Sequence, residues 1–428
     1  MDINQQYTDE MVRFRRTFHQ KPEAGWTEFR TTSIIVDRLA GLGFEVLKGK
    51  QIINPDYVMG RYASEVQLGI KRALDAGVSQ EKIDSLEGYT GAVGIWKTDR
   101  PGPVTALRFD IDALYLSETQ DAQHLPNQCG FASQYTGVMH ACGHDCHAGV
   151  GLAIAHWIAD HADQLCGTIK LLFQPAEEGT RGAMAMAQSG IVDDVDMFFA
   201  SHIGCAPRLG FVTVTSPGYN ATIKFDVSFE GKPAHSVANP QNGRNALMAA
   251  CHTAVMIGSL PRHGDGLTTV SCGKLNAGEM RNVIPTHATM QMEVRGSTNE
   301  LCQYIFSQVE RAVKANAEAF DVQYKITKVG EAFTMNPTPE LSELVKQCAA
   351  EVVGADHVSD YSEKGGSEDA TVLMARVQQH GGQAAHFYYG ANHNGQHRLD
   401  FDPDDVKSMP VGFSVLVKIL EKINQSAD

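Results

Sequence analysis

Residues Met139–His147 read MHACGHDCH, a stretch that places five potential metal ligands within a few positions: Cys142, His144, Asp145, Cys146 and His147. Thiolate, imidazole and carboxylate are the side chains that hold zinc and similar divalent ions. Cys142 and His144 are two residues apart, so both would point to the same face of an extended segment. A structural zinc site usually adds a CxxC pair, which the chain lacks. The stretch therefore predicts a catalytic metal site that takes further ligands from distant segments. The alternative is a buried cysteine beside a satisfied histidine.

Composition limits the classes of function. The chain has 428 residues, enough for two domains with sizeable cores. Apolar residues make up 43% and charged residues 20%, the balance of a globular protein. The formal charge is −14 and no dense Lys/Arg run is present, which argues against a surface for nucleic acid or anionic membrane.

The cysteines and the apolar runs indicate the compartment. Nine cysteines at irregular spacing do not resemble a disulfide framework. The start, MDINQQYTDEMVRFRR, lacks the apolar centre of a signal peptide, and no apolar run is long enough to cross a bilayer. We expect a reducing cytoplasm.

Metal-type side chains follow four predicted strands of an α/β domain. Each group comes at or just beyond the end of its strand: Asp110 and Asp112 after 103–110, Glu177 and Glu178 after 167–173, His202 after 195–200, and His393 and His397 after 383–389. In α/β sheets, sites are built at the carboxyl ends of the strands. The sequence therefore predicts that these side chains meet the Met139–His147 stretch. Solvated turns are the alternative for each pair taken alone.

The N-terminal segments read as helices and an insertion. Helical spacing of apolar residues predicts helices at 8–20, 27–41 and 148–162. His19 and Glu23 lie in the joint between the first two, either as a surface or hinge pair or with a functional role.

A polar segment at 54–88, with a helix around Glu65–Ala76, is interpreted as an insertion. The next two apolar runs, 89–97 and 103–110, are expected to pair as strands through the turn Arg100-Pro101-Gly102.

The middle of the chain has a different order of predicted strands and helices. Between about Pro217 and Gly330, strands and helices alternate as β-α-β-β-α-β, the ferredoxin-like order. We predict a catalytic domain at 1–216, an inserted ferredoxin-like domain at 217–330, and the rest of the catalytic domain at 331–428.

Six ordered motifs resemble one family. MHACGHDCH, QPAEEGTRGA, SHIG, GKPAHS, NVIP and GGSEDA are similar to those of the di-metal amidohydrolases of peptidase clan MH, which include aminoacylases, hippurate hydrolase and indole-acetyl-amino-acid hydrolases. The insertion at 54–88 and the form DALYLSE resemble the subgroup that acts on aminobenzoyl-glutamate. A proline is usual in the wider family where this chain has Tyr115.

The resemblance implies a mixed-sheet catalytic domain, an inserted dimerisation or lid domain, and two divalent ions, Mn or Zn. It implies a bridging thiolate and four further metal ligands: Cys142, His144, Glu178, His202 and one late histidine. For the last, His397 stands four residues before Phe401-Asp402, as in the subgroup, and His393 does not. Cys146 stands where glycine is common and is expected to be a silent neighbour rather than an oxidation site.

The remaining roles also come from the resemblance. Glu177 is expected to be the general base for a water whose pKa two metals lower. His235 of GKPAHS would donate to the oxyanion, and Asn282 of NVIP would bind a substrate carboxylate. Asp112 would orient a metal ligand.

The expected reaction is hydrolysis of N-acyl or N-aroyl amino acids, with p-aminobenzoyl-glutamate, giving p-aminobenzoate and glutamate, as the first choice. Alternatives are a broader aminoacylase or dipeptidase, a non-catalytic subunit, and a redox protein. A homodimer is expected from pairing of the inserted domain's sheet edge, and a hetero-oligomer with a related subunit is the alternative.

Overall fold

The computed structural model describes residues 4–215, 218–361 and 366–425. The chain divides into two compact units. Unit 1 comprises Met1–Pro217, Asn336–Ser362 and Asp369–Asp428, and unit 2 comprises Gly218–Met335 and Glu363–Glu368. The predicted first boundary, at 216/217, falls on residues outside the described part, as does Gly365 of the GGSEDA motif.

Unit 1 is built on one eight-stranded sheet in the order β1-β2-β4-β3-β5-β12-β6-β11. Parallel pairing joins β3 to β4 and β5, β5 to β12, and β6 to β11, whereas the other neighbours are antiparallel. The predicted α/β class with a mixed sheet is confirmed. The strands are β1 Glu45–Lys48, β2 Ala92–Lys97, β3 Val104–Asp110, β4 Thr168–Gln174, β5 Met197–Ile203, β6 Val212–Thr215, β11 Val358–Tyr361 and β12 Gln383–Tyr389.

The predicted pairing of 89–97 with 103–110 is wrong. The strands exist as β2 and β3, but β4 lies between them, antiparallel to β2 and parallel to β3. Gly167, just before β4, packs directly against Gly102 and Pro103 in the connection between β2 and β3. Buried on both sides, β4 is an apolar run that offers no local signal of which strands flank it.

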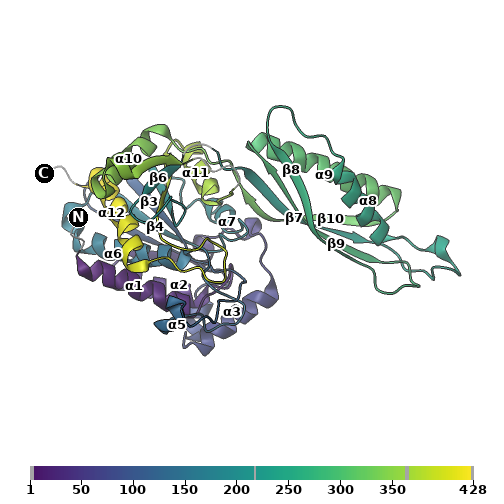
Figure 1. Cartoon of the computed structure of the whole chain (residues 1–428), viewed down its shortest axis with the longest axis horizontal. Coiled ribbons are helices and arrows are strands. Elements are labelled where there is room, and N and C mark those ends of the chain that lie inside the picture. Colours follow the sequence, from purple (N-terminus) through teal and green to yellow (C-terminus); the bar gives the residue numbers. More distant parts are fainter. Residues whose placement is uncertain (1–3, 216–217, 362–365, 426–428) are drawn as a thin grey trace. The chain divides into compact units, whose positions relative to one another are not determined.

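Helices flank the sheet of unit 1 (Figure 1), and the buried side chains of both form a large apolar core. α6, which begins inside the Met139–His147 stretch, is buried along almost its whole length, and α1 and α12 pack against it. Among the residues that the structure describes, no helix has both the length and the apolarity needed to cross a membrane. The helices of unit 1 are α1 Gln5–Gln20, α2 Phe29–Gly41, α3 Ala63–Asp75, α4 Gln80–Asp84, α5 Leu125–Gln128, α6 His144–Asp160, α7 Ala183–Ala187, α10 Pro339–Val353, α11 Ala370–Gln379 and α12 Asp405–Asn424.

The 54–88 segment folds onto the N-terminal helices. Val66, Ala73, Ile83 and Leu86 form a small apolar cluster with Phe29 of α2. The segment is therefore an elaboration of unit 1 with its own minor core.

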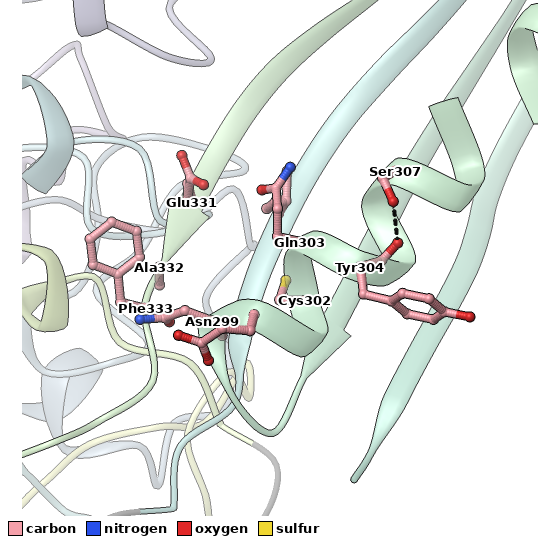
Figure 2. A pocket seen from close by; sticks show the side chains of 11 residues that line it. Asn299, Cys302, Gln303, Tyr304, Ser307, Glu331, Ala332 and Phe333 are labelled. Atoms are coloured by element: carbon pink, nitrogen blue, oxygen red, sulfur yellow. Dashed lines mark hydrogen bonds between the residues drawn. The ribbon is translucent and has the colours of Figure 1, made fainter. Parts of the chain in front are cut away.

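Unit 2 is a four-stranded antiparallel sheet in the order β10-β7-β9-β8 with two helices packed on it. Its elements follow the β-α-β-β-α-β order: β7 Ala221–Glu230, α8 Ala246–Gly258, β8 Thr268–Ala277, β9 His287–Gly296, α9 Asn299–Ala319 and β10 Gln323–Ala332. A cavity of about 580 Å³ opens beside the start of α9, lined by Cys302, Glu331 and Phe333 among others (Figure 2). Its lining includes none of the predicted catalytic or metal residues.

Candidate metal centre

The loops at the ends of β3 and β4, the end of β5 and the start of α6 bring the predicted side chains of unit 1 together. Gly143 makes the entry to α6 possible, because its φ is 93° and a Cβ there would lie 2.4 Å from Ile203 Cγ2. Cys142 and His144 therefore stand on either side of a turn that only glycine fits.

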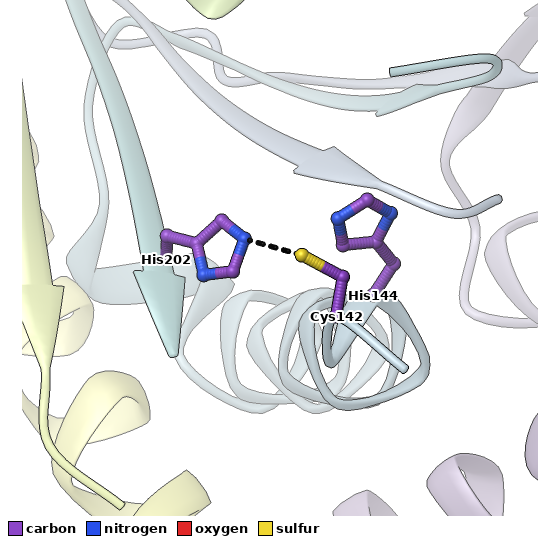
Figure 3. Close-up of side chains that lie close together, drawn as sticks. All are labelled: Cys142, His144 and His202. Atoms are coloured by element: carbon purple, nitrogen blue, oxygen red, sulfur yellow. Dashed lines mark hydrogen bonds between the residues drawn. The ribbon is translucent and has the colours of Figure 1, made fainter. Parts of the chain in front are cut away.

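Cys142, His144 and His202 form one buried group (Figure 3). The Cys142 sulfur lies 3.4 Å from His202 Nε2, and the three ligand atoms all lie within 4.8 Å of one another. His202 stands inside β5 rather than beyond it as predicted, since the strand continues to Ile203.

Two further groups share members with the first. Cys142, Glu178 and His397 come within the same 4.8 Å limit, and so do His144, Glu177 and Glu178. Within these three groups Cys142 and His144 each occur twice, so the ligand set could be shared by two adjacent cations. The turn that carries the two glutamates is strained, since Ala176 and Thr180 have φ values of 54° and 59°.

Asp112 connects these segments. Its carboxylate accepts the backbone amides of Glu177 and Glu178, each at 3.0 Å, and lies 3.2 Å from His144 Nδ1. The Asp112 carbonyl oxygen is 2.9 Å from the same nitrogen, so it accepts a hydrogen bond from a protonated Nδ1. That arrangement leaves His144 Nε2 as the nitrogen with a lone pair for a cation.

The donor set fits a divalent ion. His144 Nε2 is buried and has no hydrogen-bond partner among the described residues, a costly state unless a cation is bound there. Burial and then the nearby Glu178 carboxylate raise the pKa of Cys142 well above its usual range. A thiolate at this position therefore requires a positive charge beside it.

The late histidines differ in what they contact. His393 is used by the backbone: its Nε2 lies 2.8 Å from the Gly204 carbonyl oxygen, and its Nδ1 accepts the Gly395 amide at 2.9 Å. His397 Nε2 lies 3.5 Å from Glu178 Oε1. The His397 backbone amide donates a hydrogen bond to the carbonyl oxygen of Ala141, which lies in the Met139–His147 stretch, called the metal loop from here on. The φ of His397 is 56°, a left-handed conformation that non-glycine residues rarely adopt without a functional reason.

His397→Ala should lose bound metal and amide hydrolysis, because it removes a ligand type next to Cys142 and Glu178. His393→Ala is the matched control and should keep both properties, with a stability loss only. Metal analysis and turnover of the two purified variants decide between them, and the reverse pattern would transfer the ligand role to His393.

His235 and Asn282 lie side by side in unit 2. His235 forms an antiparallel bridge with Val283, and the Ser236 amide donates to the Asn282 carbonyl oxygen. His235 Nδ1 accepts the amides of Val237 and Ala238, so its proton is on Nε2 and that nitrogen is a hydrogen-bond donor.

A buried ionic network lies behind the metal loop, and no sequence motif indicates it. His19 is fully buried between Asp145 and Glu118, at 2.7 and 2.9 Å, so the surface interpretation of His19 is wrong. Burial alone would lower the pKa of His19, but the hydrogen bonds that its ring donates to the Asp145 and Glu118 carboxylates raise it to about 8. Glu23, equally buried, accepts the amides of Arg30 and Thr31 at the start of α2.

Two other buried residues extend the site. His147 Nδ1 contacts Asp110, whose second oxygen accepts Arg108 Nη1 at 2.6 Å, and His147 Nε2 accepts the Ile203 amide. Asp110, His144 and His147 also lie within the 4.8 Å limit. Asp110 and His147 could have been proposed from the sequence, because Asp110 is the first acid of the motif DID and His147 is the last histidine of HDCH. Cys146, by contrast, is buried in the apolar core, and its expected silence stays a prediction.

Comparison with known proteins places these residues in a family context. The model of the peptidase family M20/M25/M40 matches residues 106–422. The chain is 44% identical over 426 residues to a homolog of a p-aminobenzoyl-glutamate hydrolase subunit from Haemophilus influenzae, covering 99% of both chains. It is 40% identical over 405 residues to the indole-3-acetyl-aspartic acid hydrolase of Enterobacter agglomerans, covering 94% and 93%.

A solved structure agrees with the fold. The aminobenzoyl-glutamate utilization protein from Klebsiella pneumoniae superposes with a TM-score of 0.85 at 36% identity, over 98% of this chain and 96% of that one. The similarity therefore covers the whole architecture and is not limited to the metal loop.

Proposed function

The chain belongs to peptidase family M20/M25/M40, and from this premise we propose that it hydrolyses p-aminobenzoyl-glutamate to p-aminobenzoate and glutamate with two divalent cations. It is a hydrolase of amide bonds. The observation that carries the proposal is the convergence of Cys142, His144, Glu178 and His202 beside Glu177, in a chain that matches a relative named for this substrate along its full length.

The proposed chemistry divides between the cations and the chain. When bound, the two cations would polarise the amide carbonyl and lower the pKa of a water molecule, which makes that water a better nucleophile. Cys142 and His144, with Glu178, His202 and His397, would hold them. Mn and Zn both suit this mixture of sulfur, nitrogen and oxygen donors, and availability would decide between them.

Glu177 would act as the base. It stands next to a proposed ligand, and its amide is fixed by Asp112. The carboxylate would accept a proton from the attacking water and deliver it to the nitrogen of the leaving amine. Glu177 would therefore end the reaction in the same protonation state in which it began.

Unit 2 would complete the site. The Nε2–H of His235 would donate to the oxyanion of the tetrahedral intermediate, and the Asn282 amide would bind the substrate α-carboxylate. Pairing of unit 2 with a second copy would give a homodimer. The Haemophilus influenzae relative is named as one subunit of a hydrolase, which supports the alternative of a hetero-oligomer with a related chain.

The compartment and the second candidate substrate also belong to this proposal. All nine cysteines lie in the described part of the chain and are free, which supports a reducing compartment such as the cytoplasm. The similarity to an indole-3-acetyl-aspartic acid hydrolase makes indole-acetyl-amino acids the alternative substrates. Turnover of a panel of N-acyl glutamates, N-acyl aspartates and hippurate after reloading with Mn or Zn tests the choice. Hydrolysis of hippurate faster than of p-aminobenzoyl-glutamate would overturn it.

The substrate should require a free α-carboxylate. Converting that group of p-aminobenzoyl-glutamate to its methyl ester should lower kcat/KM about 10- to 100-fold, because a charged hydrogen-bond partner of Asn282 is lost. Release of p-aminobenzoate measures both rates. Equal rates for the acid and the ester would mean that no carboxylate pocket exists.

A further inference from the structure

Asp369, the aspartate of the GGSEDA motif, is fully buried and stands directly before α11. Its carboxylate accepts the backbone amides of Gly182 and Ala183, at 3.3 and 3.0 Å. The side-chain amide of Gln174, the last residue of β4, lies 2.9 and 3.0 Å from its two oxygens. Hydrogen bonds to an ionised carboxylate are stronger than those between neutral groups. Asp369 therefore holds both ends of the turn that joins β4 to α7.

The β4–α7 turn, residues 175–182, carries the proposed base Glu177 and the proposed ligand Glu178. Its two ends touch, since a Cβ on Gly182 would lie 1.7 Å from the Pro175 carbonyl oxygen. Two non-glycine residues of the turn have left-handed backbone angles, and such strain persists only where surrounding contacts fix the chain. A shift at Gly182 would therefore be passed on to the two glutamates.

Arg108 of β3 balances the charge of Asp369 and connects it to the other side of the metal centre. Its guanidinium donates to Asp369 at 2.9 Å and to Asp110 at 2.6 Å, and the side chains of all three residues are fully buried. Asp110 in turn contacts His147 Nδ1, and His147 Nε2 accepts the amide of Ile203 at the end of β5. Buried hydrogen bonds thus run without a break from the β4–α7 turn to β5.

The shape of the Arg108 guanidinium sets the spacing within this network. Each of its three nitrogens has a different acceptor, because Nε donates to Gln174 Oε1 at 2.8 Å while Nη1 and Nη2 donate to Asp110 and Asp369. The group is planar and rigid, so the three acceptors are held at fixed positions. A lysine would keep the positive charge and lose this geometry.

We propose that Asp369 is a positioning residue: through Arg108, it fixes the β4–α7 turn at the distance from His202 that the metal centre needs. This inference rests on the proposed function and adds to it two residues that act only through others. Small displacements of a catalytic group cost the chemical step far more than the binding of substrate. Loss of Asp369 should therefore misplace Glu177 and lower kcat without changing KM.

The test is Asp369→Asn, which keeps the shape of the side chain and removes its charge. Below the unfolding transition of each variant, kcat for p-aminobenzoyl-glutamate should fall about 10- to 100-fold with KM unchanged. The affinity for Mn, measured by titration calorimetry without substrate, should fall by a similar factor, because Glu178 and His202 lose their spacing. Asp193→Asn makes the same change at a 2.7 Å salt bridge with Arg376 of α11 and should leave all three values unchanged.

Arg108→Lys is the second variant, and it decides the question if Asp369→Asn does not fold. It should show the same fall in kcat and in Mn affinity although the charge is retained. Wild-type values in either folded variant, or a loss of stability alone, would overturn the inference. A raised KM with unchanged kcat would also overturn it, because Asp369 would then act on substrate binding. If the wild-type enzyme hydrolyses no N-acyl amino acid, the proposed function fails, whereas the comparison of Mn affinities still decides the positioning role.

Discussion

Glu177→Gln should lower kcat for amide hydrolysis by on the order of 10²- to 10⁴-fold while both cations stay bound. Glutamine keeps the size and the backbone contact of Glu177 with Asp112, but it cannot accept a proton from water. The glutamate is buried and its oxygen lies 3.9 Å from His144 Nε2, next to the proposed ligands. Because Glu177 is proposed as the base and not as a ligand, the loss should fall on turnover and not on metal affinity.

Metal content and single-turnover rates measure this prediction. Glu351→Gln in α10 is the control, since Glu351 pairs with Lys422 on the surface and should have no effect on either property. If Glu177→Gln is purified without its cations, Glu177 is a ligand and its assignment as the base is wrong.

Glu178→Ala and His202→Ala should each lose metal affinity and, with it, nearly all hydrolysis. Both side chains are grouped with Cys142, and removal of either leaves a buried thiol that cannot become a thiolate. The affinity loss should exceed the roughly 10- to 100-fold that substitution of a supporting residue costs. Asp112→Asn, which alters such a supporting residue, is the matched comparison and should fall within that range.

Titration calorimetry with Mn or Zn gives these affinities directly. Wild-type affinity and stoichiometry in either alanine variant would remove that residue from the metal centre. A variant that binds metal normally and yet fails to turn over would instead point to a role in substrate binding.

The elements of the fold were largely predictable because their signals are local. Helical spacing in 8–20 and the apolar run at 383–389 correspond to α1 and β12 within a few residues. Strand order was not predictable in the same way. The connection between β2 and β3 has the composition of a hairpin turn, but the insertion of β4 between them depends on contacts made by residues far along the chain.

The candidate site divides along the same line. Cys142, His144, Glu177 and Glu178 lie in short motifs whose residue types indicate a metal, so they could be proposed from the sequence. The buried residues that hold these ligands in place could not be predicted from the sequence. Arg15 is fully buried and bonds Asp145, Asp402 and Asp405, although in the sequence it is one of several charged residues on a helix that has an exposed face. Only the packing of α1 on α6 distinguishes it from its neighbour Arg13, which is exposed.

The central claim is that two cations held by this chain are needed to hydrolyse p-aminobenzoyl-glutamate. Its most direct test is to remove metal with a chelator, add back Mn or Zn in measured amounts, and follow p-aminobenzoate release. We expect activity to be absent without metal and to reach its maximum at two equivalents per chain. Activity that survives chelation, or that reaches its maximum at one equivalent, would contradict the di-metal proposal.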